Sequence, residues 1–333
     1  MPLELSLRNA LRLRSHSFAA QTSVTSVAAR SLLDHVEAGL REGSGAAEEA
    51  MLELFSGLYS LKSSMMPEAW ESIVAQCVAH PVAGLIHQDP FTARSFYKPR
   101  GYAGDAVLID YIYTENPRIA GNQAISALGE TIFRFTTAAP ASAGVRARRD
   151  IMACIIDESC AVVDRPHILS VACGHLREAT LCRSVLSGHV GRFVALDQDQ
   201  LSLDVVKDAT ADRGVIPVCS SIKSLFRGDI AQERFDLIYS TGLYDYLDDR
   251  IAGKLTCRLF DMLNPGGRLV IANFLPDIWC AAFMETFMGW KLVYRDSSQI
   301  HALANEVPDE QVASRRTFIE KNANIVVLDL IRQ

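Results

Sequence analysis

The spacing of apolar residues changes near residue 165. Before that point, stretches such as SVAARSLLDHVEAGL, AAEEAMLELFSGLYSL and PEAWESIVAQCVAH place apolar side chains three and four residues apart, as in helices with one buried face. After it, short apolar runs alternate with helix-like stretches, the pattern of parallel strands joined by crossover helices. We expect a helical N-terminal domain over residues 1–164 and a doubly wound α/β domain over residues 165–333.

The apolar runs expected to form parallel strands are HILSVAC, RFVALD, VIPVCS, FDLIYS and GRLVIANF. The strand-like runs WKLVYRD and NIVVLDLIRQ follow, and the polar stretch between them, Ser297 to Asn324, is expected to hold turns or a short helix. Ligands of an open parallel sheet bind outside the carboxyl ends of its strands, where the strand order reverses. The residues directly after each run are therefore the candidates for a binding site.

The ends of the first two runs carry the pattern of a nucleoside site. Ala172, Cys173 and Gly174 stand where the first run ends and open a helix that is expected to continue through Leu186, and Asp197, followed by Gln198, ends the second run. An acid there can accept hydrogen bonds from both hydroxyls of a ribose, while the turn lets backbone N–H groups approach the ligand. This combination indicates a nucleoside cofactor.

The same turn argues against a dinucleotide. Dinucleotide sites use Gly-x-Gly-x-x-Gly, so that a pyrophosphate rests on the N-terminus of a helix. Here only Gly174 is present, because Leu176 fills the position of the second glycine and Ala179 that of the third. A cofactor without phosphates fits better.

Composition excludes several classes of partner. The 333 residues carry a formal net charge of -6, whereas nucleic-acid-binding proteins usually present a basic face. The eight cysteines form no Cys-x-x-Cys pair and no zinc-like spacing, which favours reduced thiols in a cytoplasmic protein and no metal site. No apolar run approaches the roughly 20 residues that span a bilayer. The N-terminal 24 residues fit either a partly ordered leader or an amphipathic targeting segment.

From about Pro166 onward, the chain resembles class I S-adenosylmethionine-dependent methyltransferases. The resemblance rests on the Leu169–Gly174 turn, the strand end at Asp197, the polar Ser220–Ile222 segment, and Asn264–Leu269 leading into LVIANF. It implies a doubly wound, Rossmann-like methyltransferase sheet, S-adenosyl-L-methionine as the cofactor and a small-molecule acceptor. The candidate cofactor-binding residues are Tyr97, Ala172, Cys173, Gly174, Glu178, Asp197, Gln198, Ser221, Ile222, Ser240 and Thr241.

The sequence also departs from this family. Ser170 stands where the family often has an acid that anchors the methionine end of the cofactor, and Ala172 and Leu176 stand where it often has glycines. Arg177 and Glu178 are candidates to replace the acid. The alternative is that both lie in a first helical turn, facing solvent or capping it.

The segment SFYKPRGYAGD (95–105) is expected to be a lid. Its proline and glycines supply turns, Arg100 and Asp105 supply charged groups, and Tyr97 and Tyr102 supply apolar walls with hydroxyl groups. The alternative is a connecting loop in which Asp105 caps the helix AVLIDYIY. Arg100 and Tyr102 are candidate catalytic residues.

The loop after FDLIYS is the other candidate wall of the site. Tyr244, the third candidate catalytic residue, and Tyr246 could contact the acceptor or pack as core aromatics. His175 and His301 are the histidines nearest to the candidate loops, and either could serve as a general base.

The helical half and the Tyr97–Asp105 segment also resemble bacterial proteins that make a 3-hydroxy fatty acid methyl ester, the extracellular factor synthase-like group. That resemblance implies O-methylation of a carboxylate. N- or O-methylation of another metabolite, a nucleotide-dependent oxidoreductase and a non-catalytic cofactor-binding protein stay open as alternatives. The sequence does not indicate an oligomeric state.

Overall fold

The computed structural model describes residues 25–121, 124–227 and 233–333. These residues form two compact units that are not consecutive in sequence. The helical unit contains the described residues up to Gly104 together with Thr114–Ala139 and Trp279–Lys291. The sheet unit contains Asp105–Tyr113, Pro140–Ile278 and Leu292–Gln333. Two segments before residue 165 therefore belong to the sheet unit. The division into a helical domain over residues 1–164 and an α/β domain over residues 165–333 stays a prediction.

The helical unit confirms the helices predicted from the three amphipathic stretches. Residues 25–41 are helical, and the elements that follow are α2 (Ser44–Ser63), α3 (Pro67–Ala79), α4 (Val82–Ile86), α5 (Pro90–Tyr97), α7 (Ala127–Ala138) and α13 (Ala281–Phe287). The ring of Phe55 in α2 stacks on Phe283 of α13 with their centroids 4.2 Å apart. Helix α13, far along the chain, thus completes the core of the N-terminal helices.

The sheet unit has the doubly wound architecture that the alternating pattern predicts. In the described part of the chain, one seven-stranded sheet has the order β3-β2-β1-β4-β5-β7-β6. Its strands are β1 (His167–Val171), β2 (Arg192–Asp197), β3 (Val215–Cys219), β4 (Phe235–Ser240), β5 (Leu263–Phe274), β6 (Val312–Ile319) and β7 (Ile325–Arg332). Strands β1 to β5 pair in parallel, whereas β7 runs antiparallel to both β5 and β6.

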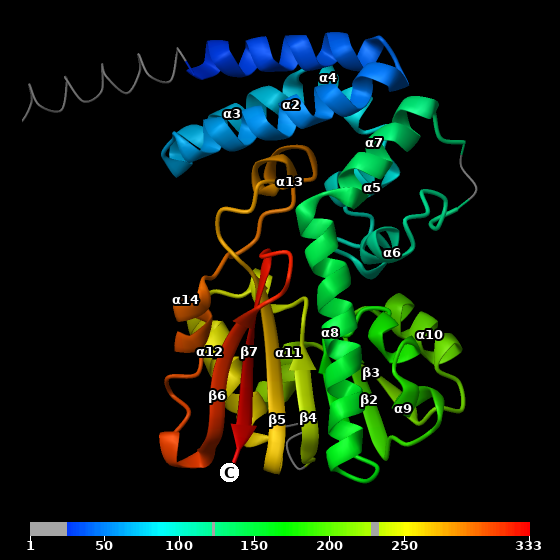
Figure 1. Ribbon diagram of the computed structural model, residues 1–333, viewed down its shortest axis with the longest axis vertical. Helices are drawn as coiled ribbons and strands as arrows, with labels where there is room; N and C mark the ends of the chain where they lie inside the picture. The colour runs from blue at the N-terminus through cyan, green and yellow to red at the C-terminus, as the bar shows by residue number, and fades with distance from the viewer. Residues whose placement is uncertain (1–24, 122–123, 228–232) are drawn as a thin grey trace, which may run out of the picture. The chain divides into compact units, whose positions relative to one another are not determined.

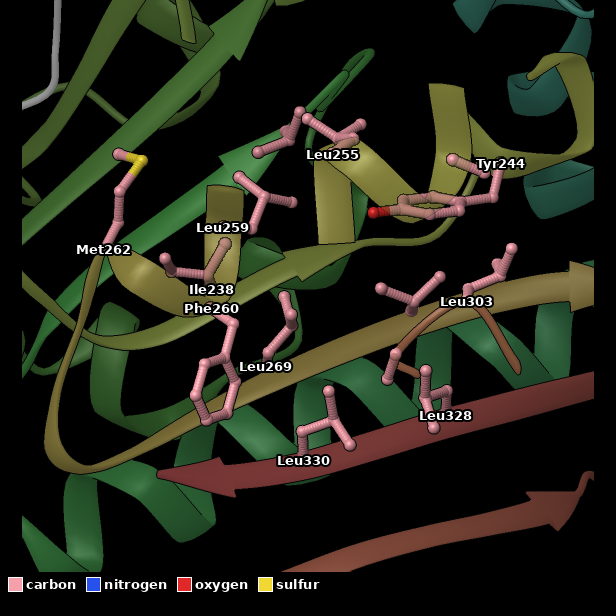
Figure 2. Close-up of a cluster of buried hydrophobic side chains, with 14 of the residues drawn as sticks. Ile238, Tyr244, Leu255, Leu259, Phe260, Met262, Leu269, Leu303, Leu328 and Leu330 are labelled. Atoms are coloured by element: carbon pink, nitrogen blue, oxygen red, sulfur yellow. The ribbon is translucent and has the colours of Figure 1, made fainter. Parts of the chain in front are cut away.

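Helices cover both faces of this sheet. The α-helices of the unit are α6 (Ala106–Thr114), α8 (Pro140–Val162), α9 (Arg183–Leu186), α10 (Gln200–Ala209), α11 (Ile222–Arg227), α12 (Asp249–Asp261) and α14 (Ser297–Ala302). Side chains alternate between the faces along a strand. Ile238 of β4 lies in a buried cluster with Leu255 and Leu259 of α12 (Figure 2). Leu169 of β1 belongs to the same cluster. Helix α8 runs along the opposite face (Figure 1).

An irregularity near the start of β5 explains two glycines of the Asn264–Leu269 motif. Gly266 has a left-handed backbone with φ of 77°, a conformation that favours glycine. A Cβ atom at Gly267 would lie 2.8 Å from the Asn264 carbonyl oxygen, too close for any other residue. The register between β4 and β5 shifts at this point, so the chain bulges before it continues along the sheet.

The helix predicted to run from the β1 turn through Leu186 is wrong. A 3₁₀ turn, η1 (Arg177–Thr180), and the short helix α9 stand in its place. The Asp157 carboxylate of α8 accepts hydrogen bonds from the backbone N–H groups of Arg183 and Ser184, at 3.2 and 2.9 Å. These bonds start α9 as a separate helix, a capping role played here by a residue distant in sequence.

The prediction of a strand at WKLVYRD is also wrong, since residues 290–296 form neither helix nor strand. The backbone N–H groups of Val293 and Arg295 donate to carbonyl oxygens of Asp245 and Phe274, at 2.7 and 2.9 Å. These bonds attach the segment to a loop and a strand end, so it joins no ladder. Strand β6 lies instead within the polar stretch, where partly exposed polar residues weaken the strand signal of a sheet edge.

Candidate active site

The strand order places a topological switch point between β1 and β4. The chain passes from β1 to β2 on one side, and β4 then pairs with the other side of β1. Ligands of open α/β sheets bind at the carboxyl ends of the strands at such a point. The candidate residues after β1, β2 and β4 converge there.

The turn after β1 has an unusual backbone. Ala172, Gly174 and Leu176 all have left-handed conformations, with φ of 55°, 54° and 50°. For the two residues other than glycine this conformation costs roughly 1–2 kcal/mol each. The two positions are those at which the resemblance expects glycine. The residue types therefore depart from the family, whereas the backbone has the conformation that glycine would adopt.

Asp197 ties the ends of β1 and β2 together. Its Oδ2 atom accepts a hydrogen bond from the Gly174 N–H at 2.8 Å, and its Oδ1 atom accepts one from the Asp199 N–H at 2.9 Å. An ionised carboxylate has about four lone-pair sites, so acceptor capacity remains for the hydroxyls of a ligand. Gly174 and Asp197, both predicted to line the nucleoside site, are thus in direct contact in the structure.

A buried ion cluster lies directly beyond the turn. Asp110 of α6 hydrogen-bonds with His175 Nδ1 at 2.8 Å and accepts from Arg177 Nε at 2.8 Å. Burial alone would raise the pKa of the Asp110 carboxyl, but the hydrogen bonds from Arg177 and His175 lower it below its ordinary value. Arg177, a candidate for cofactor contact, is thus paired with α6. His175 Nε2 has no hydrogen-bond partner among the described residues.

Glu178 does not face solvent, which contradicts the solvent-facing alternative. Its side chain is buried, and its Oε1 atom accepts a hydrogen bond from the Tyr239 hydroxyl of β4 at 2.7 Å. Burial raises the pKa of the Glu178 carboxyl above its ordinary value. A carboxyl group therefore lies between the ends of β1 and β4, close to where the resemblance expects an acid.

The remaining candidates of the sheet unit lie at the ends of β2, β3 and β4. Ser240 is buried and donates its hydroxyl to the Val171 carbonyl oxygen at 3.0 Å, and Thr241 follows it, half-buried. Ser221 starts the turn into α11, because its carbonyl oxygen accepts the Ser224 hydroxyl at 2.8 Å.

The two remaining candidates, Ile222 and Gln198, differ in the polarity of their surroundings. Ile222 packs partly against the core cluster. Gln198 is exposed, and its carbonyl oxygen lies 3.8 Å from the Cys219 thiol. Ile222 therefore contributes an apolar side chain after the end of β3, and Gln198 contributes a polar side chain after the end of β2.

Tyr244 lies in the core, as the alternative interpretation of the sequence has it. Its side chain is fully buried, and its hydroxyl is 3.2 Å from the Thr256 hydroxyl of α12. Figure 2 shows its ring next to Leu255, within the buried cluster. The structure therefore corrects the placement of Tyr244 as an acceptor contact. Tyr246, two residues on, is 41% exposed.

The segment 95–105 has the turn geometry that its composition predicts. Lys98 ends α5 in a left-handed conformation with φ of 50°, and Gly101 has φ of 87°. The Gly101 N–H donates to the Lys98 carbonyl oxygen at 2.8 Å. Tyr97 is 69% exposed.

The two ends of this segment belong to different units. Asp105 lies in the sheet unit and caps α6, because its Oδ1 atom accepts from the Leu108 N–H at 2.8 Å. That bond is the one the loop interpretation expects. Arg100 and Tyr102 belong to the helical unit, and their role in a lid stays a prediction.

Sequence reasoning missed Arg148 of α8. Its side chain is buried, and its Nε and Nη1 atoms have no hydrogen-bond partner among the described residues. Its Nη1 atom is 3.9 Å from Asp245 Oδ2. The stretch RARRD around it is typical of a solvated helix face, so only the fold distinguishes Arg148 from its neighbours. His301, the other candidate base, lies on α14, which packs against β6 and β7.

Comparison with known proteins gives structural likeness only. No protein-family model matches the chain, and no curated protein matches it. Among solved structures, the chain is similar to a possible exported protein from Bordetella parapertussis, with a TM-score of 0.54 and 19% identity, over 68% of this chain and 79% of that one. At this identity the likeness extends to the fold alone.

Two further structures have lower scores. Magnesium protoporphyrin IX methyltransferase from Synechocystis PCC 6803, with bound S-adenosylhomocysteine, has a TM-score of 0.46 and 12% identity over 68% of this chain and 98% of that one. The plantazolicin methyltransferase BpumL, in complex with a desmethyl plantazolicin analogue and S-adenosylhomocysteine, has a TM-score of 0.46 and 10% identity over 75% and 97%. The chain has a doubly wound, Rossmann-like α/β fold.

Proposed function

We propose that the protein is an S-adenosyl-L-methionine-dependent methyltransferase acting on a small molecule. The observation that carries the proposal is the hydrogen bond from the Gly174 N–H to Asp197 at the carboxyl ends of β1 and β2. It joins Asp197, the candidate acceptor for the ribose hydroxyls, to a turn with a left-handed backbone, at the edge of the sheet where ligands of this fold bind. The motif order in the sequence, Gly174, Asp197, Ser221 and then Asn264–Leu269, supports the same cofactor.

The residues around this turn have separate tasks in the proposal. When bound, the cofactor supplies a methyl group activated by its sulfonium. Asp197 accepts the ribose hydroxyls, and Ser221 and Ile222 flank the adenine. Cys173 and Gly174 bring the backbone close to the ligand, and the protein's contribution to the transfer is alignment and exclusion of water.

The structure adds an argument against a dinucleotide. A pyrophosphate needs the N-terminus of a helix with an appreciable dipole. After β1 the chain forms only η1 and α9, of four residues each. The positions of the second and third glycines hold Leu176 and Ala179, both buried. A nucleotide-dependent oxidoreductase is therefore the weaker candidate.

We further propose that the acceptor is a carboxylate, such as that of a hydroxy fatty acid. The support is the resemblance of the helical half and the Tyr97–Asp105 segment to the extracellular factor synthase-like group. A carboxylate is ionised at neutral pH, so its methylation requires no general base. Arg100 is the candidate cation for this group, because a guanidinium can hold a carboxylate through two parallel hydrogen bonds.

The net charge and the lack of a membrane-spanning helix in the described ranges bear on the acceptor and on the location of the protein. A net charge of -6 disfavours nucleic acid as the acceptor. No helix in the described ranges has the length and apolar character required to span a membrane. We propose a cytoplasmic enzyme with reduced thiols.

A turnover assay tests the function. The purified protein is incubated with S-adenosyl-L-methionine and one acceptor at a time, and S-adenosylhomocysteine is measured after its conversion to homocysteine. The acceptor set contains 3-hydroxy fatty acids, their amides, and phenols and amines of similar size. We expect product with the free acids only. Product with amines or phenols would overturn the carboxylate proposal but keep the methyltransferase, whereas calorimetric binding of NAD without binding of S-adenosylhomocysteine would overturn both.

A further inference from the structure

Arg148 is a buried cation without adequate partners. Its residue exposure is 6%, and neither Nε nor Nη1 makes a hydrogen bond within the described residues. The Asp245 carboxylate, 3.9 Å from Nη1, is beyond hydrogen-bonding distance. The other carboxylate oxygen of Asp245, Oδ1, accepts a hydrogen bond from the Phe274 N–H at 2.7 Å, which holds the carboxylate in place.

The guanidinium lies at the switch point of the sheet. A Cβ atom at Gly242, two residues beyond the end of β4, would be 3.9 Å from Arg148 Nη2. Helix α8, which carries Arg148, also packs against η1, the turn that follows β1. Arg148 is therefore held at the ends of β1 and β4, the two strands between which a ligand of this fold binds.

A guanidinium in this state is costly for the folded protein. Removing a charge from water is unfavourable unless hydrogen bonds and an opposite charge compensate it. Donors that the protein itself leaves unmatched are matched when a ligand supplies the acceptor. The geometry of a guanidinium suits a planar anion such as a carboxylate, which accepts two parallel hydrogen bonds.

Glu178 provides the opposite charge on the other side of the switch point. It is buried in η1, and the Tyr239 hydroxyl at 2.7 Å occupies its Oε1 atom. Helix α8, which carries Arg148, packs against η1, which carries Glu178, and the positive charge of Arg148 partly offsets the rise that burial causes in the pKa of the Glu178 carboxyl. Ser170, which stands where the family often has an acid, is buried in β1. Arg148 and Glu178 thus offer one cationic and one anionic group to a ligand.

We propose that Arg148 and Glu178 together bind the zwitterionic amino acid group of the cofactor, Arg148 holding its carboxylate and Glu178 its ammonium group. The inference rests on the proposed function, since it assigns the methionine end of the same cofactor. It explains why the chain dispenses with an acid at Ser170: the anchoring charges come from the helix before β1 and the turn after it.

A comparison of two nucleosides tests the assignment. S-adenosylhomocysteine carries the amino acid group, whereas 5′-methylthioadenosine shares its adenosine and sulfur but lacks that group. Calorimetric affinities of both are measured for the wild-type protein, Arg148→Met and Glu178→Gln. We expect each variant to bind S-adenosylhomocysteine about tenfold to hundredfold more weakly, the loss typical of a charged hydrogen bond. The affinity for 5′-methylthioadenosine should stay within about twofold, as no contact to the amino acid group is involved.

Two matched variants separate binding from packing. Asp245→Asn removes the nearest opposite charge from Arg148 but keeps an oxygen acceptor for Phe274. Arg149→Met removes the adjacent cation, whose guanidinium hydrogen-bonds to Asp150 at 2.8 Å. Both should retain the wild-type preference for S-adenosylhomocysteine. Glu178→Gln keeps an acceptor for the Tyr239 hydroxyl, so it tests the site even if Arg148→Met does not fold.

The outcomes are distinguishable from a failure of the proposed function. If the wild-type protein binds neither nucleoside, the cofactor assignment itself fails. If it binds both and the two variants leave the affinity for S-adenosylhomocysteine unchanged, only the amino acid site is overturned. A raised KM for a carboxylate acceptor, with unchanged S-adenosylhomocysteine affinity in Arg148→Met, would overturn it in favour of an acceptor site. Equal weakening of both nucleosides would overturn it in favour of a structural role.

Discussion

The two sides of the switch point differ in how well their polar groups are satisfied. At the ends of β1 and β2, both carboxylate oxygens of Asp197 accept backbone N–H groups. At the ends of β1 and β4, Arg148 Nε and Nη1 have no hydrogen-bond partner within the described residues. Both places are largely buried, so the difference does not come from access to water.

This difference indicates two modes of recognition. A turn whose groups are already bonded keeps its shape without a ligand and can bind the nucleoside with little reorganisation. A place with unmatched donors gains most when a ligand arrives, because buried polar groups without partners are costly. We expect substitutions that alter the backbone at the ends of β1 and β2 to weaken nucleoside binding. We expect the groups at the ends of β1 and β4 to determine which charged groups of a ligand are bound.

The largest expected effect comes from Gly174→Val, which changes the turn at the ends of β1 and β2. A β-branched residue at φ of 54° is strained, and its side chain would occupy the space where the backbone approaches the ligand. We expect S-adenosylhomocysteine binding to fall below detection by calorimetry. Gly188→Val is the control, because Gly188 also has a left-handed backbone, with φ of 74°, but no atom within 4 Å of an added Cβ. Normal binding by Gly174→Val would remove this turn from the cofactor site.

Asp197→Ala should weaken S-adenosylhomocysteine binding by about tenfold to hundredfold, through loss of charge-assisted hydrogen bonds to the ribose. Because Asp197 also accepts two backbone N–H groups, the free energy of unfolding should drop by about 1–3 kcal/mol. Affinity is measured by calorimetry and stability by denaturant unfolding.

Asp199→Ala separates these two effects. Asp199 caps α10 by accepting from the Leu201 N–H at 3.0 Å, so its removal costs about 1 kcal/mol of stability. Its affinity for the ligand should match that of the wild-type protein. A folded Asp197→Ala protein that binds as tightly as Asp199→Ala would contradict the ribose assignment.

The lid prediction extends the comparison to residues outside the sheet unit. If the segment 95–105 closes over bound ligand, backbone amides from Tyr97 to Asp105 should exchange hydrogen more slowly with S-adenosylhomocysteine present. Arg100→Ala and Tyr102→Ala should each reduce methyl transfer by at least about tenfold without changing the unfolding transition. The effect of Arg100→Ala should be the larger with a carboxylate acceptor. Exchange that is indifferent to the ligand would leave the segment as a connecting loop.

The smallest effect is expected from Ala172→Gly. Relief of the left-handed strain should raise the free energy of unfolding by up to about 1 kcal/mol, while the affinity for S-adenosylhomocysteine stays within about twofold, since the turn keeps its conformation. Ala323→Gly is the matched control, because Ala323 is exposed with φ of 54°. A loss of stability in Ala172→Gly alone would show that the turn is not strained.

Most of the fold was predictable because its signals are local. The strands β1 to β5 and β7 are short apolar runs that the sequence marks plainly. Strand β6 was not predictable in this way, since an edge strand exposes polar side chains on one face. The break between η1 and α9 depends on Asp157, which lies in α8, and no local pattern contains that information.

The site residues in turns directly after strands could be predicted from the sequence. Those whose role depends on tertiary packing could not. Gly174 and Asp197 lie at strand ends, so position alone singles them out. Tyr244 lies in the loop after β4, but its side chain turns into the core beside Thr256, a direction that sequence does not specify. Arg148 belongs to a charged helical stretch, and only the tertiary structure shows that this one cation is buried.

A crystal structure of the protein with S-adenosylhomocysteine tests the central claim most directly. We predict the ribose hydroxyls within hydrogen-bonding distance of Asp197, with the homocysteine carboxylate on Arg148 and its ammonium group on Glu178. Density for the ligand away from the ends of β1, β2 and β4, or a ribose that does not contact Asp197, would contradict the assignment of this edge of the sheet as the cofactor site.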